Sequence, residues 1–371
     1  MQWAWRVPRP IGSCRPGGNC RSCGVSSINL EFTSDCKPGI RRVRRGGRFS
    51  YFAPGGRRIA DPALLTRIRK LAIPPAYQDV WICSDPRGHL QATGRDARGR
   101  KQYRYHPEWR SHRDAAKFDR MLDFGKSLAR IRRRVAQDLR KPGLPREKVL
   151  ATLVRLLERT LIRIGNEEYA RSNGSFGLTT LRDRHVRIRG SKLTFEFRGK
   201  SGIAHCVSVE DPAIARIVQR CADIPGQELF QWIDEDGERH GVDSADVNEY
   251  LREASGGPFT AKDFRTWFAT VEALQALRKR PVGNKGEVKK ELVETIATVA
   301  RRLGNTPTIC RKCYIHPEVL TAFADGRLAK LNGAKPAVAL RGLLRRRSMT
   351  SLLKASLNQA RKASSQRTPT H

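Results

Sequence analysis

The sequence has no apolar run long enough to cross a bilayer. No segment approaches the ~18–20 consecutive apolar residues that a membrane-spanning helix needs, and the first ten residues contain no apolar stretch typical of a secretory signal. Hydrophobic residues make up only 39% of the chain, below the roughly 45–50% usual in globular proteins. We therefore expect a protein that is neither membrane-integral nor secreted, with some segments outside the core.

Nucleotide-binding motifs are also missing. There is no G-x-x-x-x-G-K-[ST] motif, which argues against P-loop ATP binding, and no G-x-G-x-x-G motif follows an expected strand. The acidic cluster at 234–238 falls in an expected turn, and we interpret it as solvent-exposed rather than metal-binding. The sequence therefore predicts no ATP requirement, no divalent metal requirement and no other cofactor.

The cysteines do not suggest a disulfide framework. There are nine, an odd number in a long chain, which indicates a reducing, cytoplasmic compartment. The two C-x-x-C pairs, Cys20–Cys23 and Cys310–Cys313, lie too far apart in sequence to favour one shared zinc site. A small N-terminal zinc knuckle made by Cys14, Cys20, Cys23 and Cys36 is an alternative to an unstructured leader.

Positive charge is abundant. Lys and Arg number 72 against 36 Asp and Glu, which gives a net charge of +36 and a pI near 10.8. The first 58 residues carry +10 and the last 31 carry +8, so half of the excess lies in the segment between them. A folded region with this charge attracts polyanions, and the sequence therefore predicts nucleic-acid binding, although membrane-surface and ribosome-associated proteins share this composition.

Composition and periodicity divide the chain into four segments. Residues 1–38 are expected to form a disordered leader, 39–110 a small β-rich lobe, 111–340 a mainly helical lobe with a three-stranded sheet, and 341–371 a basic tail. Strand-like runs near 49–52, 80–83 and 102–106 and one helix near 62–71 define the small lobe. The fold class is therefore α+β in two lobes.

Apolar periodicity predicts the elements of the larger lobe. The second expected helix starts at Pro145, continues to about Ile164 and therefore includes Arg163. The other expected helices are 115–139, 212–221, 244–254, 261–278, 288–303 and 310–323. The expected strands are 186–188, 192–197 and 205–209.

The segment Leu303–Pro317 carries a tyrosine after a short turn. A helix is expected to end at Gly304, and Thr306-Pro307 starts the segment that contains Tyr314. This stretch resembles the active-site segment of type IB DNA topoisomerases of the poxvirus-like and bacterial branch. In that family a His or Asn lies nine residues before the nucleophilic Tyr, and Asn305 and Tyr314 have this spacing.

The resemblance extends from about Arg41 to Phe323. Arg163-Ile164-Gly165 resembles the family segment with the first catalytic Arg, which implies Arg163. Phe197–Gly202 resembles the hairpin with the catalytic Lys, which implies Lys200. Residues 262–266 resemble the segment with the second catalytic Arg, which implies Arg265. In the small lobe, residues 99–105 resemble a strand that contacts bases and phosphates. The implied DNA-binding residues are Arg100, Gln102, Tyr103, Tyr105 and Tyr169. The alternating aromatics of that strand are also typical of ordinary sheet packing.

The resemblance implies an ATP-independent, nucleoid-associated isomerase that relaxes supercoils. Tyr314 would attack a phosphodiester to give a 3′-phosphotyrosyl link, with Arg163, Arg265 and Asn305 on the phosphate oxygens and Lys200 as general acid. The implied architecture is a monomeric C-shaped clamp around double-stranded DNA. Two alternatives are a tyrosine recombinase-like strand transferase, which uses similar chemistry, and a non-catalytic DNA-compacting protein.

Overall fold

The computed structural model describes residues 29–97, 99–281, 283–331 and 333–345. The chain divides into two compact units, Met1–Ala115 and Ala116–His371. Within the described ranges, no helix has both the length and the apolar character that a bilayer span requires.

The smaller unit is built on a five-stranded antiparallel sheet with the strand order β2-β1-β3-β4-β5. Ile40, Val80, Ile82 and Ala92 from the strands pack with Ile68 from the helix to form its core, which confirms the predicted β-rich lobe. The four arginines of β1 hid that strand from the sequence analysis. The elements are β1 (Ile40–Arg45), β2 (Arg48–Phe52), α1 (Pro62–Lys70), β3 (Gln78–Ile82), β4 (Leu90–Arg95) and β5 (Lys101–Tyr105).

The end of the expected leader belongs to this unit. The Glu31 N–H donates to the Arg87 carbonyl over 2.9 Å, and the Thr33 hydroxyl donates to the Leu90 carbonyl over 3.1 Å. The prediction of a disordered leader up to residue 38 is therefore wrong for 29–38, because these residues bond to the segment leading into β4. Residues 1–28, with three of the four cysteines of the zinc-knuckle alternative, lie outside the described residues.

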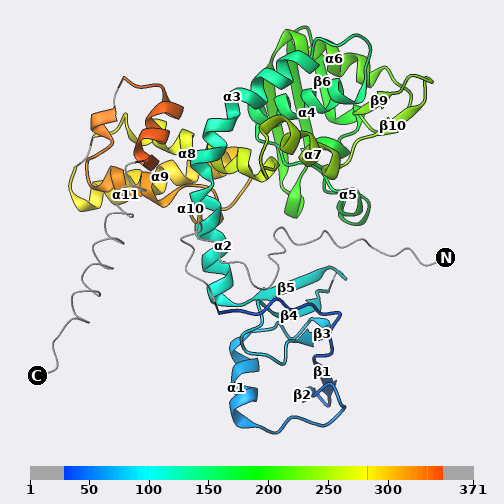
Figure 1. The fold of residues 1–371 in the computed structure, drawn as a ribbon, viewed down its shortest axis with the longest axis vertical. Helices are drawn as coiled ribbons and strands as arrows, with labels where there is room; N and C mark the ends of the chain where they lie inside the picture. The colour runs from blue at the N-terminus through cyan, green and yellow to red at the C-terminus, as the bar shows by residue number, and fades with distance from the viewer. Residues whose placement is uncertain (1–28, 98, 282, 332, 346–371) are drawn as a thin grey trace, which may run out of the picture. The chain divides into compact units, whose positions relative to one another are not determined.

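Helices dominate the larger unit. In Figure 1, α4 lies beside α6 and α7, and α8 to α11 form a second group of helices. The apolar face of α4 is buried at the centre of the core. The unit begins within α2 (Pro107–Asp119). Its other helices are α3 (Met121–Asp138), α4 (Arg146–Thr160), α5 (Glu167–Asn173), α6 (Pro212–Ala222), α7 (Ser244–Ser255), α8 (Ala261–Leu277), α9 (Lys285–Leu303), α10 (Pro307–Cys313) and α11 (Pro317–Ala324).

Two expected helices are each divided in the structure. The helix expected at 115–139 is interrupted between α2 and α3, and the one expected at 310–323 is two helices, α10 and α11. The second division places Tyr314 in the short connection between α10 and α11. Tyr314 therefore lies at the end of a short helix rather than inside a longer one.

The predicted three-stranded sheet is present in the larger unit. Strands β6 (Val186–Arg189), β7 (Lys192–Arg198) and β8 (Ala204–Glu210) are antiparallel in that order. Alternate residues of β7 are buried against the helical core, as expected for a sheet with one face covered. A shorter ladder, β9 (Gln231–Ile233) with β10 (Arg239–Gly241), flanks the acidic turn and was not predicted.

The helical core continues beyond the expected start of the basic tail. Residues 336–345 are helical, and Leu340, Leu343 and Leu344 are buried in the core of the larger unit. The predicted boundary at residue 341 is therefore too early, because an i, i+3, i+4 leucine pattern continues across it. Residues 346–371 lie outside the described part of the chain.

Candidate active site

Tyr314 is held by its backbone at the end of α10. The Thr306 side chain accepts a hydrogen bond from Ile309 N–H and so caps the start of this helix. At the other end, Tyr314 N–H donates to the Cys310 carbonyl over 2.9 Å, and its own carbonyl accepts a 2.9 Å bond from the Thr270 hydroxyl of α8. Thr270 is fully buried, so the Tyr314 backbone is tied to the core helix α8.

Asn305 is positioned by the end of α9. Gly304 adopts a left-handed conformation with φ 59° as the C-terminal cap, and Asn305 N–H then donates to the Ala300 carbonyl over 2.9 Å. The Asn305 side-chain oxygen accepts a hydrogen bond from Arg163. Its side-chain nitrogen Nδ2 is buried and has no hydrogen-bond partner among the described residues.

Arg163 lies beyond the end of α4. Leu161 takes a left-handed conformation with φ 56° and ends the helix, so the prediction that Arg163 belongs to that helix is wrong. Apolar periodicity continues through Ile164, but it does not reveal a left-handed leucine. Beyond this reversal, Arg163 donates to the Gly304 carbonyl over 3.2 Å as well as to Asn305.

Arg265 is a buried cation between two helix ends. It is 4% exposed and donates to the Leu161 carbonyl after α4 and, over 2.7 Å, to the Leu303 carbonyl at the end of α9. Carbonyls at helix C-termini carry partial negative charge, which stabilises a cation there. Burial, with a contribution from Arg163, lowers the pKa of Arg265 to about 10, so it remains charged at neutral pH. Its Nε atom is buried and has no partner in the described ranges.

These cations act on the Tyr314 hydroxyl. The Arg265 guanidinium carbon lies 5.4 Å from the centroid of the Tyr314 ring. Burial alone would raise the pKa of Tyr314, but Arg265, Arg163 and Lys117 together hold it below its ordinary value. The structure thus brings four of the five predicted catalytic residues together and favours ionisation of the tyrosine.

Lys200 is the exception. It lies in the turn between β7 and β8 and is exposed, with no hydrogen bond or ion pair to another described residue. The hairpin predicted from the sequence is present, but its lysine does not contact the other four residues. Any role of Lys200 in the reaction therefore depends on how this turn is held relative to them.

Two residues near Tyr314 were missed by the sequence analysis. Lys117 of α2 donates to the Cys313 carbonyl, and its ammonium nitrogen lies 5.0 Å from the centroid of the Tyr314 ring. Thr270 lies in the core of α8, where its hydroxyl binds the Tyr314 backbone. Neither residue belongs to a motif, and among 72 basic residues Lys117 has no distinguishing sequence signal.

Most candidate DNA-binding residues lie in the smaller unit. Tyr103 and Tyr105 stack on one face of β5, with ring centroids 6.1 Å apart, and Tyr103 is 47% exposed. Arg100 and Gln102 instead both contact the Asp96 carboxylate, with Gln102 at 3.0 Å and Arg100 at 2.7 Å. The two pairs therefore differ: the tyrosines present an aromatic surface, whereas Arg100 and Gln102 help to order the β4–β5 turn.

Tyr169 lies in the larger unit. It is 41% exposed on α5.

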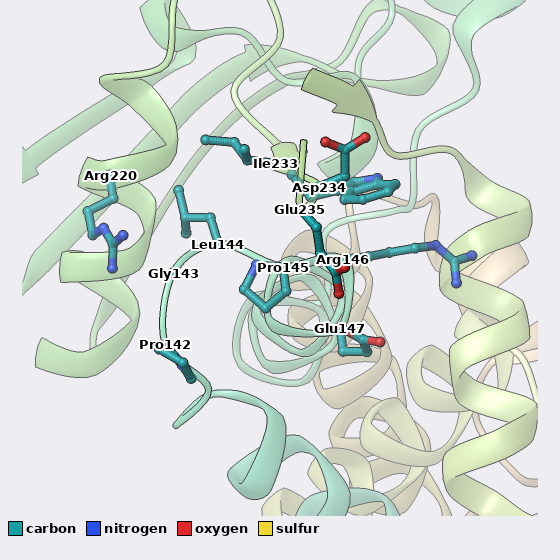
Figure 2. Close-up of a pocket in the computed structure, with 11 residues that line it drawn as sticks. Pro142, Gly143, Leu144, Pro145, Arg146, Glu147, Arg220, Ile233, Asp234 and Glu235 are labelled. Atoms are coloured by element: carbon teal, nitrogen blue, oxygen red, sulfur yellow. The ribbon is translucent and has the colours of Figure 1, made fainter. Parts of the chain in front are cut away.

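The pocket in Figure 2 lies apart from these residues. It is formed by the loop before α4, the start of α4 and residues around β9, including Leu144, Pro145 and Ile233. None of the predicted catalytic residues lines it. In the part of the chain that the structure describes, no group of three or more His, Cys, Asp or Glu side chains is arranged to hold a metal ion.

Comparisons with known proteins match both units. Residues 106–337 match the family model "Eukaryotic DNA topoisomerase I, catalytic core", and residues 48–96 match "Bacterial DNA topoisomerase IB, N-terminal domain". DNA topoisomerase 1B of Acanthamoeba polyphaga mimivirus is 34% identical over 295 residues, which cover 77% of this chain and 88% of the viral protein. DNA topoisomerase 1B of Vaccinia virus (strain Copenhagen) is 22% identical over 252 residues, which cover 67% of this chain and 76% of that protein.

A solved structure gives a much weaker likeness. The XerH site-specific recombinase bound to palindromic difH substrate has a TM-score of 0.33 and 14% identity, covering 56% of this chain and 50% of the recombinase. At that score the likeness carries no argument.

Proposed function

The chain belongs to the type IB DNA topoisomerase family, and on that premise we propose that Tyr314 is the nucleophile of its reaction. As a type IB DNA topoisomerase the protein is an isomerase that acts on DNA. It cleaves one strand through a 3′-phosphotyrosyl intermediate, lets the free end rotate and reseals the strand. The family matches support this reading over the recombinase-like and non-catalytic alternatives.

Unpaired donors beside Tyr314 carry the proposal. Asn305 Nδ2 and Arg265 Nε are buried N–H groups without a hydrogen-bond partner in the described ranges. A buried donor left unpaired costs about 1–3 kcal/mol, so a site that retains two of them is suited to a ligand rich in acceptors. The non-bridging oxygens of a phosphodiester have that chemistry.

The arrangement supports in-line attack at phosphorus. The lowered pKa of Tyr314 favours the phenolate, which forms the new bond to phosphorus. Arg163 and Arg265 supply positive charge where negative charge develops on the five-coordinate phosphorus, and Asn305 adds a neutral amide donor. The bond to the 5′-oxygen breaks, and we assign Lys200 as the general acid that protonates this oxygen. The phosphotyrosyl ester formed in this exchange conserves the free energy of the broken phosphoester bond, so resealing needs no ATP.

We also propose that the enzyme needs no cofactor. Purified protein is expected to relax positively and negatively supercoiled plasmid in EDTA without ATP, because the proposed charge stabilisation comes from side chains alone. Agarose gels that resolve topoisomers measure this directly. Strict dependence on ATP or on a divalent cation would contradict the proposed mechanism.

The pH dependence of cleavage tests the cations around Tyr314. On a substrate whose leaving group is a 5′-bridging sulfur, the single-turnover cleavage rate should rise with pH and level off as the tyrosine ionises. Lys117→Gln keeps a donor for the Cys313 carbonyl but removes a charge that lowers the pKa of Tyr314. The rate of this variant should therefore level off at higher pH than the parent rate. An identical pH profile would show that Lys117 does not influence the hydroxyl.

The exposed tyrosine pair predicts a separate effect on site choice. Tyr103→Ala should change which DNA sites are cut, because the Tyr103 ring is exposed beside Tyr105 on β5. The slope of log DNA affinity against log salt concentration should hardly change. Gln102→Ala is expected to behave in the same way if its amide leaves Asp96 to read a base. Cleavage maps and salt titrations on each variant measure the two effects. An unchanged map for both variants would indicate that these side chains only pack the sheet.

We propose further that the protein acts as a monomer that closes as a C-shaped clamp around duplex DNA at the nucleoid. The net charge of +36 supports a close association with DNA. Sedimentation velocity tests whether the protein is a monomer. Crosslinking between the two units on duplex DNA tests whether they close as a clamp. Imaging of a fluorescent fusion protein tests whether it is located at the nucleoid.

A further inference from the structure

His205 packs against the turn that carries Lys200. Its imidazole ring stacks on Phe197 of β7, with ring centroids 5.0 Å apart and an interplanar angle of 8°. A Cβ atom added to Gly199, the residue directly before Lys200, would lie 2.6 Å from Cδ2 of the ring. The ring thus occupies the space where a side chain at position 199 would begin.

The same ring packs against the turn that carries Asn305. A Cβ atom added to Gly304 would lie 2.3 Å from Cε1 of His205. Gly304 is tied to its surroundings, because its N–H caps α9 and its carbonyl accepts a hydrogen bond from Arg163. One side chain therefore joins the exposed hairpin turn to a turn that is fixed by the core.

The contact is one of shape rather than hydrogen bonding. The His205 ring nitrogens have no hydrogen-bond partner among the described residues. Burial, then Arg163 and Arg265, lower the pKa of His205, so the ring is neutral at neutral pH and adds no third cation beside the arginines. The narrow gap between Gly199 and Gly304 accommodates a flat, neutral ring.

We propose that His205 is a positioning residue that holds the Lys200 turn against the turn between α9 and α10. Lys200 itself forms no hydrogen bond or ion pair with another described residue that would fix its location. The inference rests on the proposed role of Lys200 as general acid. A loss of position of about 1 Å can slow a reaction by up to about 100-fold, and a general acid contributes about 10²–10⁴-fold.

The leaving group provides the test. His205→Ala should slow single-turnover cleavage by about 10- to 100-fold on an ordinary duplex, measured at a mapped cleavage site. On the same duplex with a 5′-bridging sulfur, the rate should remain near that of the parent, because a thiolate leaves without a proton. Cys206→Ala is the matched control: its side chain lies on the opposite face of β8, and both of its rates should equal the parent rates.

Two further variants test whether the effect passes through Lys200 and through ring contact. In a Lys200→Ala background, His205→Ala should cause no additional loss on the ordinary duplex. Gly199→Ala should reproduce the leaving-group difference, because its Cβ displaces the ring while its φ of −94° suits alanine. Adding Gly199→Ala to His205→Ala should cause no further loss of cleavage rate. Unchanged thermal unfolding and DNA affinity establish that each variant is folded.

The possible failures can be told apart. If sulfur does not rescue Lys200→Ala, the proposed acid and this inference both fail. If sulfur rescues Lys200→Ala but His205→Ala slows both substrates equally, or slows neither, only the inference about His205 is overturned.

Discussion

Tyr314→Phe should abolish DNA cleavage and leave DNA binding nearly intact. The substitution removes only the nucleophilic oxygen, and the remaining ring still lies beside the Arg265 guanidinium and the Lys117 ammonium. Loss of a nucleophile costs several orders of magnitude, so the single-turnover cleavage rate should fall by more than about 10⁴-fold. Fluorescence anisotropy with a labelled duplex should give an affinity close to that of the parent.

Tyr250→Phe is the matched control for this substitution. Tyr250 is also buried, and its hydroxyl donates a 2.8 Å hydrogen bond to Asp138 far along the chain. Its loss should cost about 1–2 kcal/mol of stability but leave the cleavage rate unchanged. A covalent adduct formed by Tyr314→Phe would show that another residue attacks the phosphate.

Lys200→Ala should have the second-largest effect. A leaving 5′-oxygen needs a proton, and removal of a general acid costs about 10²–10⁴-fold in rate. Replacing the 5′-bridging oxygen with sulfur should restore most of this loss, because a thiolate is a good leaving group without protonation. Quench-flow measurements on the two duplexes give the ratio of rates directly.

Lys192→Ala separates this effect from a general loss of positive charge. Lys192 is an exposed lysine at the start of β7, on the same hairpin as Lys200, and its replacement should slow neither duplex. Failure of sulfur to rescue Lys200→Ala would assign Lys200 to phosphate binding instead of proton transfer.

Much of the site could be predicted because its elements end at residues with clear sequence signals. Gly304 ends α9 and Thr306-Pro307 starts α10, as glycine caps and an N-terminal proline indicate. These signals locate α10 between Asn305 and Tyr314, whereas the choice of these two residues came from their nine-residue spacing, which matches the family pattern. The β7–β8 hairpin was likewise predicted from alternating apolar residues that are buried in the structure.

The remaining features depend on contacts between distant residues. Leu161 adopts a left-handed conformation that leucine rarely takes, so periodicity alone extended α4 through Arg163. Thr270 and His205 act through tertiary contacts with a backbone or a ring, and no local pattern marks such contacts. The end of the leader was misjudged for the same reason: Glu31 and Thr33 form their hydrogen bonds near β4, more than fifty residues away.

The most direct test of the central claim is to identify the residue that becomes linked to DNA. The protein is incubated with a duplex carrying a single mapped cleavage site near its 3′ end, so that the short leaving strand dissociates and the covalent complex accumulates. After nuclease and protease digestion, mass spectrometry locates the nucleotide on the peptides. The account predicts a 3′-phosphonucleotide on Tyr314. A nucleotide on any other residue, or linked through its 5′ end, would contradict it.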